Sequence, residues 1–322
     1  MAGLGTFISV GKSLDQAIER VKRAEELGYD STYVTHIAGR DSLTVLMAYA
    51  CATERVKLGT GVLPIYSRTP VATAQQAATI DEYSNGRMVL GLGVSHQVTV
   101  ENWYDQTIDR PLKAMREYVG AVRAAFRCEE PPGGEIFRTN FRFMGYEPRP
   151  HLPIYVAALS PKMLCLAGEI ADGAMLWLCN PEYIRDVVVP EVTKGRERAG
   201  KTLEGFDVVA AVPSAVADRE SAYETIRNDL ITYWSLPYYR AMIERSGFGD
   251  DIAAFDAGIE AGDVEQAKRA ISDRFLDSLT AIGSPEEVRA GVDRYFDAGA
   301  TSPGIGPVPR TDFGATLEAA KQ

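Results

Sequence analysis

Short apolar segments alternate with amphipathic segments along almost the whole chain. The apolar segments have the length and composition of buried strands, and the segments between them repeat apolar residues at helical spacing. Eight strands are predicted, over residues 5–10, 31–36, 56–64, 87–95, 153–159, 173–178, 206–216 and 301–308. The predicted helices between them include 41–54, 161–171, 182–199 and 285–298.

Four of the predicted strand-to-helix junctions share one local signature. Each places a residue with a short polar side chain directly before a proline, which is the preferred order for an N-cap followed by the first helical residue. The junctions are Thr69-Pro70, Ser160-Pro161, Asn180-Pro181 and Ser284-Pro285. They predict where four helices begin.

Eight strand–helix units predict an α/β fold, the (β/α)8 TIM barrel, as one domain over residues 1–322. Insertions are expected after strand 4, at about 97–150, and after strand 7, at about 218–283. The first is expected to hold a loop, a helix near 110–126 and a hairpin over 135–150, and the second to be helical. Prolines in the last predicted strand weaken the strand count, so an open doubly wound sheet is the competing fold.

The net charge of −10 and the pI near 5.0 argue against nucleic acid or an anionic membrane as the main partner. No apolar stretch approaches the roughly 18 residues of a membrane helix, and no signal peptide is visible at the start. The four cysteines are scattered and form no CxxC pair. A cytoplasmic location is therefore expected.

Several common catalytic motifs are missing from the sequence. GLGVSH, at 91–96, has the first two glycines of a dinucleotide fingerprint but His96 in place of the third. Three histidines without a His-x-His pair make a poor metal site, so no metal is expected. No nucleophile elbow is present, which leaves nucleophilic hydrolysis without a motif.

The ends of the third, fourth and fifth strands carry small residues that suit a flat cofactor. Gly61, Gly91 and Gly93 have no side chain to block a ring system, although tight packing inside a small barrel is the alternative explanation for each. Ala157, Ala158 and Ser160 lead into a helix N-terminus, where free N–H groups and the helix dipole favour a phosphate.

Two histidines lie at equivalent ends of predicted strands, His36 at the end of strand two and His96 at the end of strand four. Either is a candidate for proton transfer near neutral pH, and a structural role for each is the alternative. Trp103, Tyr104 and Trp177 lie near strand ends and are candidates for the wall of a substrate pocket or for aromatic core.

Several stretches together resemble the luciferase-like monooxygenase superfamily, specifically its coenzyme F420-dependent oxidoreductase branch. They are AEELGYDSTYV (24–34), the long segment 52–96, REYVGAVR (116–123), PIYVAALSPKMLCLAGEIADG (153–173) and LPYYRAMIERSG (236–247). They span most of the chain and follow the family order. The resemblance implies a (β/α)8 barrel with the deazaflavin at the mouth formed by the carboxyl ends of the strands.

The resemblance also assigns residues. It implies a non-proline cis peptide at Gly61-Val62 behind the cofactor ring, ring and side-chain contacts from Gly93-Val94-Ser95-His96, and a phosphate turn at Ala157-Ala158-Leu159-Ser160. His36 maps to a position near the reactive edge of the ring. A homodimer paired through outer helices is expected.

The predicted activity is hydride transfer between coenzyme F420 and a small organic substrate, with His36 or His96 handling the proton. Three alternatives stay open: an FMN-dependent monooxygenase fed reduced flavin by a separate reductase, a non-catalytic barrel that binds a ligand, and a metal-dependent barrel hydrolase.

Overall fold

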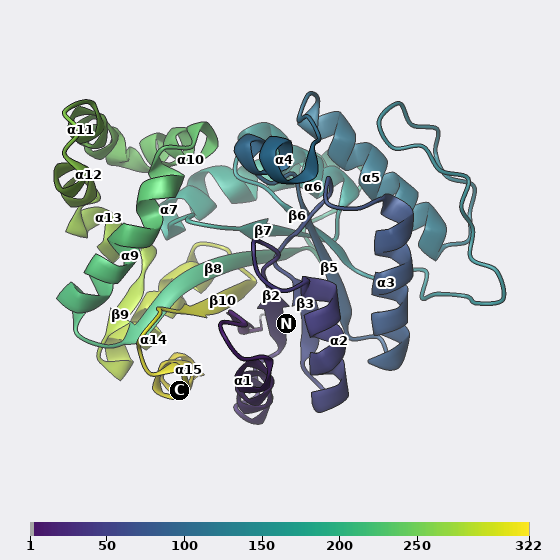
Figure 1. Ribbon diagram of the computed structural model, residues 1–322, viewed down its shortest axis with the longest axis horizontal. Helices are drawn as coiled ribbons and strands as arrows, with labels where there is room; N and C mark the ends of the chain where they lie inside the picture. The colour runs from purple at the N-terminus through teal and green to yellow at the C-terminus, as the bar shows by residue number, and fades with distance from the viewer. Residues whose placement is uncertain (1–2, 322) are drawn as a thin grey trace.

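Eight parallel strands close into a barrel in the computed structural model, which describes residues 3–321 (Figure 1). In sheet order they are β1 (Gly5–Phe7), β2 (Ser31–Val34), β3 (Lys57–Thr60), β5 (Met88–Gly93), β6 (Ile154–Ala157), β7 (Gly173–Leu176), β8 (Asp207–Val216) and β10 (Ser302–Pro307). The barrel closes because β10 pairs with both β1 and β8. All eight predicted strands are confirmed, and the open doubly wound sheet is excluded.

Two short strands extend the sheet without joining the closed ring. The strand β4 (Leu63–Pro64) continues the chain after β3 and pairs with β5, and β9 (Ala281–Gly283) pairs with the end of β8. The predicted helical insertion 218–283 thus ends in a strand.

Helices surround the barrel. Their bounds are α1 (Leu14–Glu26), α2 (Ser42–Ala52), α3 (Pro70–Tyr83), α4 (Gln97–Tyr104), α5 (Pro111–Phe126), α6 (Pro161–Ile170), α7 (Pro181–Tyr183), α8 (Val189–Arg198), α9 (Arg219–Trp234), α10 (Pro237–Ile243), α11 (Gly249–Glu260), α12 (Val264–Ala270), α13 (Asp273–Leu279), α14 (Pro285–Asp297) and α15 (Phe313–Lys321). Single π-helical turns at Ile184–Val188 and Glu244–Phe248 link α7 to α8 and α10 to α11. All four predicted polar-residue–proline junctions are N-caps whose side chains accept a main-chain N–H.

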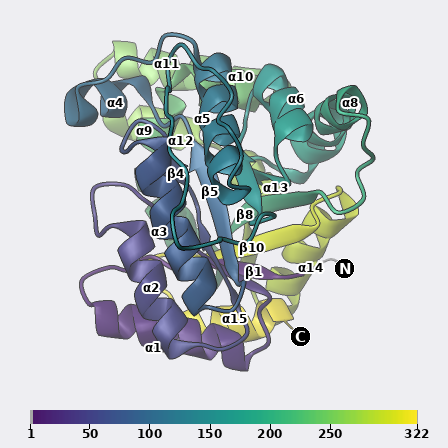
Figure 2. The same cartoon turned by 90° about the vertical axis from the view of Figure 1, so that its right-hand side faces the viewer.

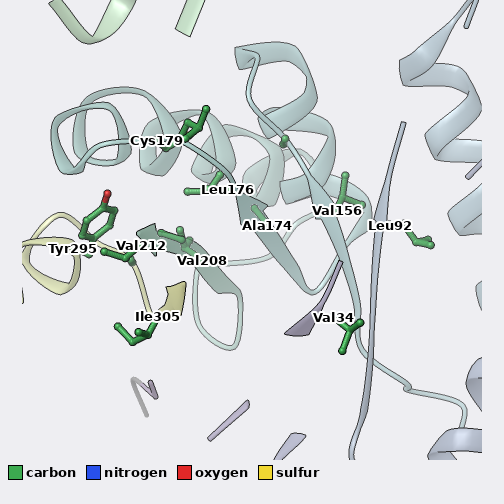
Figure 3. Packing of buried hydrophobic residues seen from close by; sticks show 14 of the residues in the cluster. Val34, Leu92, Val156, Ala174, Leu176, Cys179, Val208, Val212, Tyr295 and Ile305 are labelled. Atoms are coloured by element: carbon green, nitrogen blue, oxygen red, sulfur yellow. The ribbon is translucent and has the colours of Figure 1, made fainter. Parts of the chain in front are cut away.

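Alternate residues of the strands face two separate apolar layers. The inward side chains Tyr33, Val89, Tyr155, Met175 and Val209 pack together with Phe7 and Val62 and fill the barrel. The outward side chains, among them Val34, Leu92, Val156 and Ile305, join a larger cluster with the helices, in which Tyr295 of α14 takes part (Figure 3). This alternation is what the strand period of two requires.

The prolines of β10 do not prevent the last strand from forming. The pairing of β10 with the three-residue strand β1 involves only Gly304 and Ile305. Pro303 and Pro307 lie outside that stretch, so the ladder with β1 does not need their missing N–H groups.

Both insertions follow strand carboxyl ends, and their helices α4, α9, α10 and α11 gather at one end of the barrel (Figure 2). The helix near 110–126 is confirmed as α5. Residues 97–104, expected to be a loop, form α4 instead.

The predicted hairpin over 135–150 is wrong, because this segment contains no strand. It runs beside α3 and α5 as an irregular strap (Figure 1). The carboxylate of Glu117 on α5 accepts the N–H groups of Ile136 and Phe137, at 2.7 and 3.0 Å. The ring of Phe137 packs edge-on against Tyr118, with centroids 5.0 Å apart. The side chain of Glu117 on α5 thus accepts main-chain N–H groups that would pair between strands in a hairpin.

Candidate active site at the barrel mouth

His36 lies two residues beyond the end of β2, with 12% of its side chain exposed. Its Nδ1 atom is 3.3 Å from the main-chain nitrogen of Ser42, which donates to it, and 3.2 Å from the Ser42 hydroxyl. The carboxylate of Asp41 is 3.7 Å from the same nitrogen and also accepts a hydrogen bond of 2.5 Å from Arg68. No described residue makes a hydrogen bond to Nε2 of His36.

Burial lowers the pKa of His36 below its usual value, and the nearby Arg68 charge lowers it further. The carboxylate of Asp41 opposes both effects and raises the pKa, but the net shift is downward. The lowered pKa favours the neutral form of the ring at pH 7.

The peptide bond between Gly61 and Val62 is cis, as the resemblance predicted. It lies between β3 and β4 at the mouth end of the barrel, and both residues are half-buried. The Val62 side chain lies above Gly93, because a Cβ built on Gly93 would stand 2.6 Å from Val62 Cγ2.

Barrel packing by itself requires the three candidate glycines. A Cβ on Gly91 would stand 2.0 Å from the carbonyl oxygen of Thr60, and one on Gly61 would stand 2.6 Å from the Phe7 ring. Added to the contact of Gly93 with Val62, these distances mean that the Cβ direction at all three sites is blocked by the protein itself. The packing alternative raised from the sequence thus accounts for these residues without a ligand.

The end of β5 turns sharply into α4. Val94, Ser95 and His96 are half-buried, and Ser95 has a left-handed backbone with φ of 61°. His96 is the N-cap residue of α4, but its side chain makes no capping hydrogen bond. Burial lowers the pKa of His96. The imidazole of His96, unlike that of His36, makes no hydrogen bond to a described residue.

Aromatic residues of the second insertion enclose His96. The ring centroids of Tyr233 and Tyr239 lie 6.2 and 5.7 Å from the imidazole. Trp177, just past the end of β7, lies edge-on to Tyr233 at 6.0 Å. Its indole nitrogen is buried and has no hydrogen-bond partner with suitable geometry in the described part of the chain.

Tyr233 and Tyr239 were missing from the candidates chosen by sequence. The aromatic run TYWSLPYYR in the second insertion was the signal that could have found them. By contrast, Trp103 is 51% exposed on α4, and Tyr104 at the end of that helix is half-buried. The structure does not bring these two residues into the aromatic group.

The turn after β6 leads into α6 through Ala157, Ala158, Leu159 and Ser160. The Ser160 hydroxyl caps α6 by accepting the N–H of Met163, which leaves its own hydrogen free to donate. The N–H of Ala158 is already taken by the carbonyl oxygen of Met175, at 3.2 Å. The N–H groups of Leu159, Ser160 and Lys162 make no hydrogen bond to described residues, so they are the donors left for an anion at this helix N-terminus.

Within residues 3–321, no group of three or more histidine, cysteine or acidic side chains is placed to hold a metal ion. Over the same residues, no helix combines the length and the apolarity that crossing a bilayer requires.

The sequence matches the family described as luciferase-like monooxygenase over residues 2–302. It is 32% identical over 289 residues to a 5,10-methylenetetrahydromethanopterin reductase of Archaeoglobus fulgidus, covering 87% of this chain and 86% of that protein. It is 29% identical over 306 residues to a putative coenzyme F420-dependent oxidoreductase of Mycobacterium tuberculosis, covering 88% of both. The coenzyme F420-dependent tetrahydromethanopterin reductase of Methanopyrus kandleri has a similar fold, with a TM-score of 0.84 and 24% identity over 100% of this chain and 97% of that one.

Proposed function

This chain belongs to the luciferase-like monooxygenase family, and we propose that it is an oxidoreductase that transfers a hydride between coenzyme F420 and a small organic substrate. The observation that carries the proposal is the similarity, over 88% of the chain, to a putative coenzyme F420-dependent oxidoreductase. The relative with the higher identity is also named as a reductase.

The residues at the mouth fit a flat ring with a phosphate-bearing side chain. The turn Ala157–Ser160 offers two unused N–H groups and a hydroxyl at the N-terminus of α6, where an anion is favoured. The half-buried residues Val62, Val94 and Ser95 line the strand ends with small uncharged groups.

In this proposal the cofactor supplies the two-electron chemistry, and the chain supplies orientation and the exclusion of water. The residues assigned to the ring are Gly61, Val62, Gly91, Gly93, Val94 and Ser95, and those assigned to the phosphate are Ala157, Ala158, Leu159 and Ser160. We assign His36 and His96 to the reacting centre, and Trp177, Tyr233 and Tyr239 to the substrate wall. Trp103 and Tyr104 are assigned to its outer rim.

Cofactor titration tests the proposal. Fluorescence quenching or calorimetry with coenzyme F420 and, separately, with FMN is expected to show tight binding of F420 alone. Tight binding of FMN without binding of F420 would replace this function by a flavin-dependent monooxygenase. Binding of neither would leave a non-catalytic barrel.

A matched pair of variants locates the cofactor phosphate. Ser160→Asp keeps an N-cap residue but places a negative charge at the proposed phosphate turn, so F420 affinity is expected to fall at least tenfold. Ser284→Asp makes the same change at the N-cap of α14, where no cofactor contact is proposed, and is expected to leave the affinity within twofold. Equal effects of the two variants would exclude the turn as the phosphate site.

We further propose a homodimer that pairs through the outer faces of α2 and α3. Helix α2 has no charged residue, and the exposed positions of α3 carry only one, Glu82. An uncharged face on a chain of net charge −10 is typical of an interface core. Light scattering on the purified protein is expected to give the mass of a dimer, and Ala48→Arg with Ala72→Arg is expected to give a monomer. A monomeric parent protein would contradict this pairing.

We propose that residues 1–322 form one domain. We also propose that the protein is located in the cytoplasm. All four cysteines are free thiols, which suits a reducing compartment. Fractionation of the native host cells, followed by immunoblotting, tests the location.

A further inference from the structure

The two nitrogens of the His36 ring have different environments. The main-chain N–H of Ser42 points at Nδ1 from 3.3 Å, and the Ser42 hydroxyl oxygen lies 3.2 Å away. A main-chain N–H can only donate, so Nδ1 must hold a lone pair when this contact is made. The single proton of the neutral ring is then on Nε2, the nitrogen without a protein partner.

The contact follows from how α2 begins. Ser42 is the first residue of this helix and is fully buried, and the N-cap Asp41 accepts the N–H of Thr44 at 2.9 Å. The first N–H groups of a helix have no partner within the helix, so His36 satisfies one that Asp41 leaves free. The positive end of the helix dipole also opposes a positive charge on the ring.

Two charged groups face His36, and they largely cancel one another. The carboxylate of Asp41 lies 3.7 Å from Nδ1 and would favour an imidazolium ring. It is shared with Arg68, whose guanidinium binds it at 2.5 Å and also donates to Gln76. The ring therefore does not face an unpaired carboxylate.

We propose that Ser42, through its main-chain N–H, holds His36 as a neutral imidazole protonated on Nε2, so that His36 is a fixed hydrogen-bond donor at the mouth. This inference rests on the proposed function for its use. A hydride carries two electrons to the substrate carbon, and negative charge then develops on the oxygen or nitrogen attached to it. His36 stabilises that charge by its Nε2–H bond without giving up the proton, since loss of that proton would leave a buried imidazolate. The proton that completes the reduction comes from His96, which regains one from solvent water.

From the sequence, either His36 or His96 could transfer the proton. The proposed tautomer of His36 reduces this choice to one residue. His36 is excluded from that role, because its one lone pair is occupied by Ser42. His96, whose imidazole makes no hydrogen bond to a described residue, keeps the role in proton transfer.

Nitrogen NMR of the cofactor-free protein tests the tautomer directly, because bare and protonated imidazole nitrogens resonate far apart. The chain has only three histidines, so the signals of each can be assigned by their loss in the variants His36→Gln, His96→Gln and His151→Gln. From pH 7 to 8, the Nε2–H form is expected to be the dominant form of the neutral His36 ring. His151, which is exposed, serves as an internal control and is expected to show the averaged shifts of exchanging tautomers. Averaged shifts, Nδ1 protonation or an imidazolium for His36 at pH 7 would overturn the proposal.

Two variants test the cause. Ser42→Ala removes only the hydroxyl and is expected to keep the Nε2–H form. Ser42→Pro removes the main-chain donor at the first helical position, where proline is well tolerated and stands in six other helices of the described residues. It is expected to give shifts averaged like those of His151. Loss of the tautomer in Ser42→Ala would assign the effect to the hydroxyl instead. These spectra need no cofactor, so they succeed or fail independently of F420 binding.

Discussion

The substitution Gly91→Ala separates a packing role from a cofactor role at the strand end. The new Cβ would stand 2.0 Å from the carbonyl oxygen of Thr60 and 2.6 Å from the sulfur of Met175. The sulfur can move, but the carbonyl belongs to the neighbouring strand. The clash is therefore relieved only by moving β5 away from β3.

That movement breaks a local pair of hydrogen bonds. The N–H of Gly91 donates to the Thr60 hydroxyl at 2.9 Å, and this hydroxyl donates to the Gly91 carbonyl oxygen at 2.7 Å. Overpacking costs about 1–3 kcal/mol, and each buried hydrogen bond contributes about 1 kcal/mol. We expect Gly91→Ala to lower the free energy of unfolding by about 3–5 kcal/mol, which for a chain of this length is roughly 5–8 °C in Tm.

Thermal and urea unfolding of the cofactor-free protein measure this loss. Gly249→Ala is the matched control, because that glycine has helical backbone angles and no atom within 4 Å of its Cβ position. Its Tm is expected to stay equal or rise slightly. If Gly91→Ala unfolds within 1 kcal/mol of the parent and only its F420 affinity falls, the packing argument is refuted.

Three further predictions concern charged groups. Asp41→Asn keeps the N-cap of α2 but removes the carboxylate that raises the pKa of His36, so an NMR titration should show this pKa falling further, and a rise would contradict the assignment. Glu25 accepts three consecutive main-chain N–H groups, which outweigh burial and lower its pKa. Its contribution is present above the unfolded pKa of about 4.3 and is lost as pH falls, so Glu25→Gln should reduce stability at pH 7 more than at pH 3. Arg149→Met leaves the buried Asp81 without its bidentate partner and should cost about 2 kcal/mol in urea unfolding, less than a fully buried pair because Arg149 is 37% exposed.

The barrel could be predicted because its signals are local. Each strand is a short apolar run, and the polar-residue–proline junctions contain the whole of an N-cap within a few residues. The hairpin prediction failed for the opposite reason. The alternation in EIFRTNFRF is typical of strands, but the donors of this segment are satisfied by Glu117, about 20 residues away on α5. The alternation of apolar and polar residues within a segment carries no information about a hydrogen-bond partner on another helix.

The candidate site also combines features that the local sequence reveals with contacts to residues distant in the chain. The sequence proposes His36 and His96 as site residues because each lies at the end of a predicted strand. Their differing chemistry depends on what packs against them. The Nδ1 atom of His36 meets the helix that begins six residues later, whereas His96 meets aromatic rings of Tyr233 and Tyr239, about 140 residues away in the chain. Two histidines with equivalent positions in sequence thus become unlike groups, one a fixed hydrogen-bond donor and the other a ring free to exchange its proton, through the elements that the barrel brings to them.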